Sequence, residues 1–154
     1  MKKSILIIAL AVAAAACNNG ATKSTPEQTE ETQTQETTPD LYGQEWSLVE
    51  LNSKAITVDT TFQKKPHLIF EKDSSRAVGN GGCNSFSANF ELKENDGIEL
   101  SHAVATQMAC PNMDIEQQFF EILTKVKGYQ IDGNSLTLYN ENKEALARLE
   151  ASAQ

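Results

Sequence analysis

Three cysteines are the side chains of this sequence best suited to covalent or metal chemistry: Cys17, Cys83 and Cys110. A thiol can be acylated, can form a disulfide, or can bind zinc or copper together with an imidazole. Cys17 directly follows a short apolar segment, whereas Cys83 and Cys110 lie 27 positions apart in the body of the chain. The positions therefore predict one use for Cys17 and another for the remaining pair.

Residues 1–16 have the parts of an export signal: a basic start, an apolar run and small residues before Cys17. The apolar stretch is shorter than the roughly 20 residues that a membrane-spanning helix needs. A thiol placed directly after small residues resembles the bacterial lipobox, although Ala14 stands where that pattern usually has Leu. We expect residues 1–16 to be a signal peptide and Cys17 to carry lipid. The alternative is a plain secretory signal followed by an incidental cysteine.

Residues 17–40 differ in composition from the rest of the chain. After Cys17 they are rich in Thr, Gln, Glu and Pro and contain no aromatic or large aliphatic residue. Such a segment cannot offset its ordering entropy, so we expect a disordered tether with a mean reach of roughly 25 Å. Residues 41–154 are then one domain of ordinary size.

The chain has a formal net charge of −8, and removing Lys2 and Lys3 with the signal changes it to −10. An acidic protein is unsuited to nucleic acid or to electrostatic adhesion to anionic lipid, because both select basic patches. We therefore expect a membrane contact through the N-terminal lipid and no nucleic-acid partner. The expected location is the cell envelope, at the periplasmic side of the outer membrane.

Hydrophobic alternation with a period of two predicts most of the domain to be β-strand. Strands are expected at 46–51, with a bulge near Val49, and then at 68–70, 77–78, 86–92, 98–100, 129–131, 136–138 and 146–149. The period changes at Asp114, which predicts one amphipathic helix ended by Gly128. The predicted fold is mostly β with one helix (α+β), a small antiparallel β-barrel-like domain. A two-layer α+β sandwich is the alternative.

Several motifs resemble the META domain (HslJ-like) family. They are Trp46-x-Leu48, the stretch from Gly79 to Phe90 containing Gly-Cys-Asn-x-Phe, the stretch Thr106-Gln107-Met108-Ala109-Cys110, and a following helix with Glu116 and Phe119. Ala88 departs from the family, which often has Gly there. The resemblance implies a barrel-like fold with one helix on envelope lipoproteins, and a connection with heat shock, envelope stress and drug tolerance. It implies no agreed ligand, reaction or catalytic residue.

Once Cys17 is committed to lipid, Cys83 and Cys110 are expected to form a disulfide, because an oxidising envelope permits one. Closing this loop would destabilise the unfolded chain by about 3.6 kcal/mol on the loop-entropy model. Two buried reduced thiols are the alternative. A metal site that adds His102 is disfavoured because the spacing differs from that of structural zinc sites. His67 and His102 are expected to be strand residues.

The glycine-rich run Gly79-Asn80-Gly81-Gly82 lacks the Lys-Ser/Thr and the helix start of a phosphate-binding loop. We expect its glycines to allow a tight or left-handed turn that the Asn84 side chain caps. Ser85 and Ser87 have no base and orienting acid arranged around them, so no catalytic residue, cofactor or metal is predicted.

The sequence thus predicts a non-catalytic envelope lipoprotein that acts through an unknown envelope protein or cell-wall component. Exposed loops on a rigid scaffold commonly carry such contacts. The expected contact residues are Gly79, Asn80, Gly81, Gly82, Asn84, Met108, Pro111, Asn112 and Met113. Two alternatives stay open: a barrel that holds a small apolar ligand, and a thiol or metal site made from Cys83 and Cys110.

Overall fold

The computed structural model describes residues 40–58 and 60–152 of the chain. The expected signal peptide, Cys17 and the tether up to residue 39 lie outside the described residues. In the described part, no helix has the length and apolar character needed to cross a membrane.

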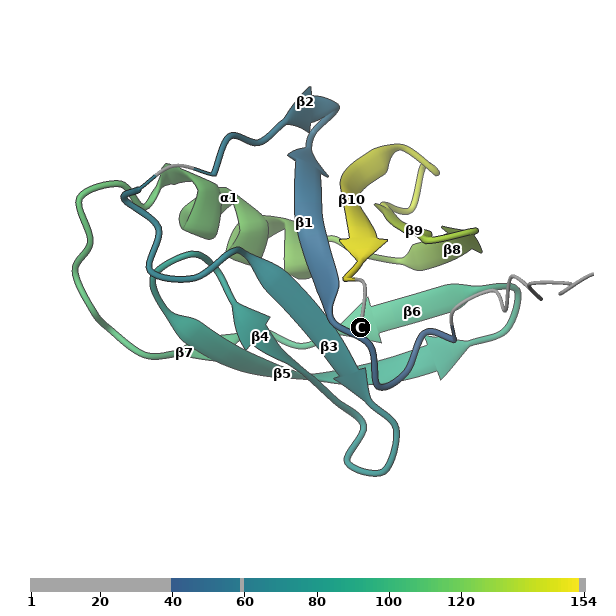
Figure 1. Cartoon of the computed structure of the whole chain (residues 1–154). Coiled ribbons are helices and arrows are strands. Elements are labelled where there is room, and N and C mark those ends of the chain that lie inside the picture. The colour runs from purple at the N-terminus through teal and green to yellow at the C-terminus, as the bar shows by residue number, and fades with distance from the viewer. Residues whose placement is uncertain (1–39, 59, 153–154) are drawn as a thin grey trace, which may run out of the picture. The chain divides into compact units, whose positions relative to one another are not determined.

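The described residues form ten β-strands and one α-helix, shown in Figure 1. The strands are β1 (Trp46–Leu51), β2 (Lys54–Ala55), β3 (His67–Glu71), β4 (Arg76–Asn80), β5 (Ser85–Lys93), β6 (Gly97–Leu100), β7 (Val104–Ala105), β8 (Gly128–Asp132), β9 (Ser135–Tyr139) and β10 (Ala145–Ala151). The helix α1 (Asp114–Leu123) lies between β7 and β8. The prediction of a mostly β domain with one helix is confirmed.

The sheet is antiparallel and curls into a ring. Its strands follow the order β10-β9-β8-β6-β5-β4-β3-β1, and β1 also pairs with β10, which joins the two ends of that order. The joint between β6 and β8 is narrow, with the single register pair Gly97–Gly128. Closure into a ring agrees with the predicted barrel-like fold and not with the two-layer alternative.

Local sequence explains how the strands turn and bend. Asn95 and Asp96 both have left-handed backbone angles and connect β5 to β6, as a tight hairpin turn requires. The register of β1 against β10 shifts between Leu48 and Glu50, which confirms the bulge expected near Val49. The bulge re-aims β1, so that Leu48 and Leu51 are both buried.

The interior of the ring is filled by side chains from the strands and from α1. The largest fully buried ones include Trp46, Phe70 and Phe119. Phe86 of β5 contacts Phe119 edge to face, with ring centroids 5.8 Å apart, and this contact packs the helix against the sheet. This packed interior weakens the alternative of an apolar ligand held inside the barrel.

Two sequence expectations were wrong. The helix ends at Leu123, before Gly128, because the Thr124 hydroxyl donates to the Glu121 carbonyl oxygen and the Lys125 N–H donates to the Ile122 carbonyl oxygen. Gly128 instead begins β8 and does not have a left-handed backbone. His67 does lie in β3, but His102 lies in the exposed connection between β6 and β7.

Candidate interaction site

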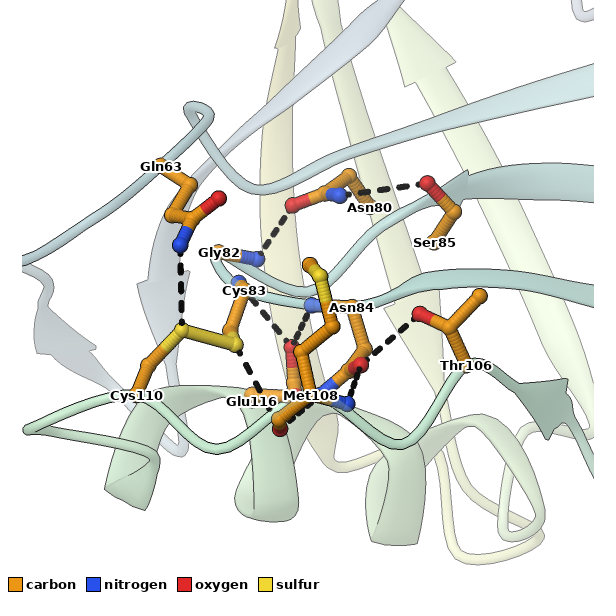
Figure 2. Close-up of a disulfide and its surroundings, with 10 residues drawn as sticks. All are labelled: Gln63, Asn80, Gly82, Cys83, Asn84, Ser85, Thr106, Met108, Cys110 and Glu116. Carbon is orange, nitrogen blue, oxygen red and sulfur yellow. Dashed lines mark hydrogen bonds between the residues drawn. A yellow bond between two sulfur atoms is a disulfide. The ribbon is translucent and has the colours of Figure 1, made fainter.

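A disulfide between Cys83 and Cys110 joins two loops that are distant in the sequence (Figure 2). Cys83 lies in the connection between β4 and β5, and Cys110 lies in the connection between β7 and α1. Their Cα atoms are 6.2 Å apart. The expected disulfide is confirmed, and the alternative of two reduced thiols is not what the structure contains.

A buried carboxylate joins the helix α1 to the loop that contains Cys83. Glu116, in the first turn of α1, is only 3% exposed. Its Oε2 accepts the Cys83 N–H at 3.0 Å and the Asn84 N–H at 2.6 Å, and its Oε1 accepts the Asn84 side-chain amide at 2.7 Å. Three donors satisfy the buried charge, which would otherwise be costly.

Asn84 extends this network to the second loop. Its Oδ1 accepts the Met108 N–H and the Thr106 hydroxyl, both at 2.7 Å, and its Nδ2 also donates to the Met108 carbonyl oxygen at 3.1 Å. The expected capping role of Asn84 was therefore wrong. Asn80 caps the glycine turn instead, because its Oδ1 accepts the Gly82 N–H at 2.7 Å.

Two glycines allow this arrangement. A Cβ on Gly81 would lie 2.6 Å from Glu116 Cγ, so the close approach of the loop to α1 requires its absence. Gly82 has a φ of +121°, which side chains rarely adopt. The expectation that glycines serve backbone geometry here is confirmed at these two positions. We call the disulfide, Asn84 and Glu116 together the clasp.

The sequence profile of the META domain matches residues 39–153 of this chain. The chain belongs to the META domain family. No curated protein matches it significantly.

Solved structures with the same fold include two determined by NMR. One is 24% identical with a TM-score of 0.52, covering 70% of this chain and 88% of the other. The second, from Burkholderia xenovorans, is 21% identical with a TM-score of 0.58, covering 74% and 85%. A crystal structure of a DUF4847 family protein from Bacteroides vulgatus is 16% identical with a TM-score of 0.52, covering 74% and 96%. Identities this low support the fold of the META domain only.

The expected contact residues of this META domain differ in their exposure. Asn80, Gly81, Gly82 and Asn84 are buried, because the clasp and its turn use them, and Gly79 and Met113 are half-buried. Met108, Pro111 and Asn112 are exposed, and the Met108 side chain is 47% exposed. The surface of the two loops thus comes mainly from the segment after β7, while the glycine-rich loop supports it.

An open groove of about 440 Å³ adjoins this segment of the META domain, next to the exposed Met108. Its apolar walls come from Met108, Met113 and Phe120, and Asn84 and Glu116 of the clasp also line it. Met side chains adapt to different partners because they are flexible and polarizable. The groove is therefore suited to contact an apolar side chain of another molecule.

The disulfide of the clasp argues against the alternative of a thiol or metal site at Cys83 and Cys110. Both sulfur atoms of Cys83 and Cys110 are bonded to each other, so neither is available as a thiolate. Among the described residues, no three His, Cys, Asp or Glu side chains gather in a way that would hold a metal ion. The ring of His67 already has a hydrogen-bond partner, because its Nδ1 lies 2.8 Å from the Lys65 carbonyl oxygen.

Sequence reasoning missed the role of Glu116. It noted this residue only as part of the family motif, although one signal was present. Glu116 lies three residues before Phe119 and therefore on the apolar face of the predicted helix, where a carboxylate needs a partner.

Proposed function

We propose that this chain is a non-catalytic, lipid-anchored envelope protein whose META domain contacts another envelope component through the surface beside the clasp. Its role would be in envelope or heat stress and in drug tolerance. The META domain is not a known enzyme family. The expected export signal and Cys17 support an anchor, on the periplasmic side of the outer membrane, and the acidic charge argues against nucleic acid.

One observation carries this proposal: the clasp restrains both loops, while Met108 beside it is exposed. The disulfide and the Asn84–Glu116 hydrogen bonds restrain both loops, so a bound partner would cost little ordering entropy there. The same loops leave Met108 exposed above the groove. A preorganised loop pair with an apolar rim is typical of a protein-contact surface.

A paired substitution tests this proposal. Met108→Asp places a charge at the rim, and Leu92→Asp is its matched control, because Leu92 is another exposed apolar residue, at 37%, on β5 away from the groove. We expect Met108→Asp to lower survival of heat and envelope stress at unchanged protein level, because loss of an interface hot spot of about 2 kcal/mol weakens binding of the partner by roughly thirtyfold. Leu92→Asp should behave as the unmodified protein does.

In-cell crosslinking gives the second readout. A photoreactive residue at position 108 should capture a discrete envelope component, and one at position 92 should not. Full stress survival with Met108, Pro111 and Asn112 all replaced, together with equal crosslinking from both positions, would contradict the proposal.

A further inference from the structure

A second open pocket, of about 470 Å³, lies beside the joint between β6 and β8, and none of the expected contact residues lines it. Its walls are the turn between β5 and β6, the start of β8, and the end of β9 with the turn after it. The pocket exists because β6 and β8 share only one register pair, Gly97–Gly128, and the adjacent turns project beyond it.

Tyr139 provides an aromatic surface in this pocket. It follows the buried Leu136 and Leu138 in β9, one position after Leu138, so its ring lies on the outer face of the sheet. Its cross-strand neighbour on β8 is Gly128, which has no side chain to cover the ring, and its neighbour on β10 is Ala145. The Tyr139 hydroxyl lies 3.4 Å from Gln130 Oε1, which orients the ring along β8.

The charges around the pocket are balanced. Asp96 and Glu141 are negative, and Lys127 and Lys143 are positive. The Lys127 ammonium is also 3.0 Å from Glu99 Oε1, so part of its charge is already compensated. This lining does not favour a strongly anionic or cationic ligand. It presents donors and acceptors of several kinds, which suits a neutral ligand with many hydroxyl groups.

The turn after β9 places Lys143 in the lining of the pocket. Lys143 has a φ of +61°, a conformation that Gly or Asn adopts at lower cost. Asn140 fixes this turn, because its Oδ1 accepts the N–H groups of Asn142 and Glu144, both at 2.9 Å. The fixed turn therefore determines where the Lys143 side chain leaves the backbone beside the pocket.

We propose that this pocket binds a sugar ring of a neutral glycan. The apolar C–H face of the sugar packs on the Tyr139 ring, as weak C–H contacts with aromatic faces allow. The Asp96 and Glu141 carboxylates accept from sugar hydroxyls, and the Lys143 ammonium donates to them. This site goes beyond the proposed function, because it is separate from the clasp and recognises a different class of ligand.

Gly128→Val tests the proposal at the floor of the pocket. A Cβ at position 128 would meet only Asp96 O, at an ordinary 3.5 Å, and the backbone there is not left-handed, so the fold should accept the change. The valine side chain would then occupy the space in front of Tyr139. Thr137→Val is the matched control, because Thr137 lies on the same outer face of β9 but does not line the pocket.

The measurement is ligand-observed saturation-transfer NMR on the purified full chain, with an N-acetylglucosamine tetramer and maltotetraose as probes. We expect saturable transfer from at least one probe, with a dissociation constant of roughly 0.1–10 mM. Gly128→Val and Tyr139→Ala should each weaken it about tenfold or more, and Thr137→Val should not. No saturable transfer from either probe, unchanged affinity in Gly128→Val, or equal loss in Thr137→Val would overturn the proposal.

Discussion

Glu116 shows how one residue can determine whether a loop surface exists. It is an ionisable side chain among apolar neighbours, and it satisfies three donors from the loop between β4 and β5. Its position in the first turn of α1 also places its negative charge near the positive end of the helix dipole. The single carboxylate thus couples the helix start to Asn84, and Asn84 couples it to Met108.

The substitution Glu116→Gln tests the role of this carboxylate most directly. The variant keeps the shape but replaces one acceptor oxygen with a donor, which would then face a donor N–H group of Cys83 or Asn84. Asn84 cannot compensate by turning, because its Oδ1 already accepts from Thr106 and Met108. We expect a loss of about 1–3 kcal/mol in the free energy of unfolding, measured by urea denaturation.

Glu121→Gln is the control for that substitution, because Glu121 is exposed on the same helix. It should change stability by no more than about 0.5 kcal/mol. Equal stability of the Glu116→Gln variant and the unmodified protein would show that the network does not hold the loops.

At the scale of elements, short sequence patterns predicted the strands and turns that depend on residues close together in the sequence. Alternation located eight of the ten described strands but not the two-residue strands β2 and β7, and the Asn95–Gly97 turn located the β5–β6 hairpin. The end of α1 was missed, because the buried Val126 continues the helical spacing although the chain has already left the helix at Thr124. The pairing of β1 with β10 and the contacts of Asn84 join distant segments, so no local pattern encodes them.

Gly81→Ala tests the contact between the glycine loop and α1. The added Cβ would lie 2.6 Å from Glu116 Cγ and 2.8 Å from its Oε2, so the loop or the helix must shift. Overpacking of this kind typically costs about 1–3 kcal/mol, and we expect a loss of that size in thermal or urea unfolding. Gly128→Ala has only an ordinary contact and should be nearly neutral. A neutral Gly81→Ala would mean that the two elements are not tightly packed.

At the scale of the whole molecule, the domain combines a closed sheet with a proposed lipid anchor. Closure leaves few free strand edges in the described domain, which would limit edge-to-edge association if the proposed anchor concentrates the protein on a membrane. The tether expected from the sequence would give the domain a mean reach of roughly 25 Å from Cys17. On that expectation, any partner of the clasp surface or of the Tyr139 pocket would have to come close to that membrane.

The anchor is tested by Cys17→Ala. We expect labelled palmitate to incorporate into the unmodified protein and not into the variant, and the variant to leave the membrane fraction, because two or more acyl chains are needed for stable anchoring. Cys83→Ser with Cys110→Ser is the control and should keep the label. Label that persists in Cys17→Ala would show that the acylated residue is a different one.

The pairing of β1 with β10 also brings the two ends of the domain together. Trp46 is paired with Ala151, and the Ser152 N–H donates to the Glu45 carbonyl oxygen at 2.9 Å. A short linker between these ends should therefore permit circular permutation, with new termini at the exposed Gly133 between β8 and β9. Such a permutant would present the same clasp and the same pocket in a new orientation to the surface on which it is attached.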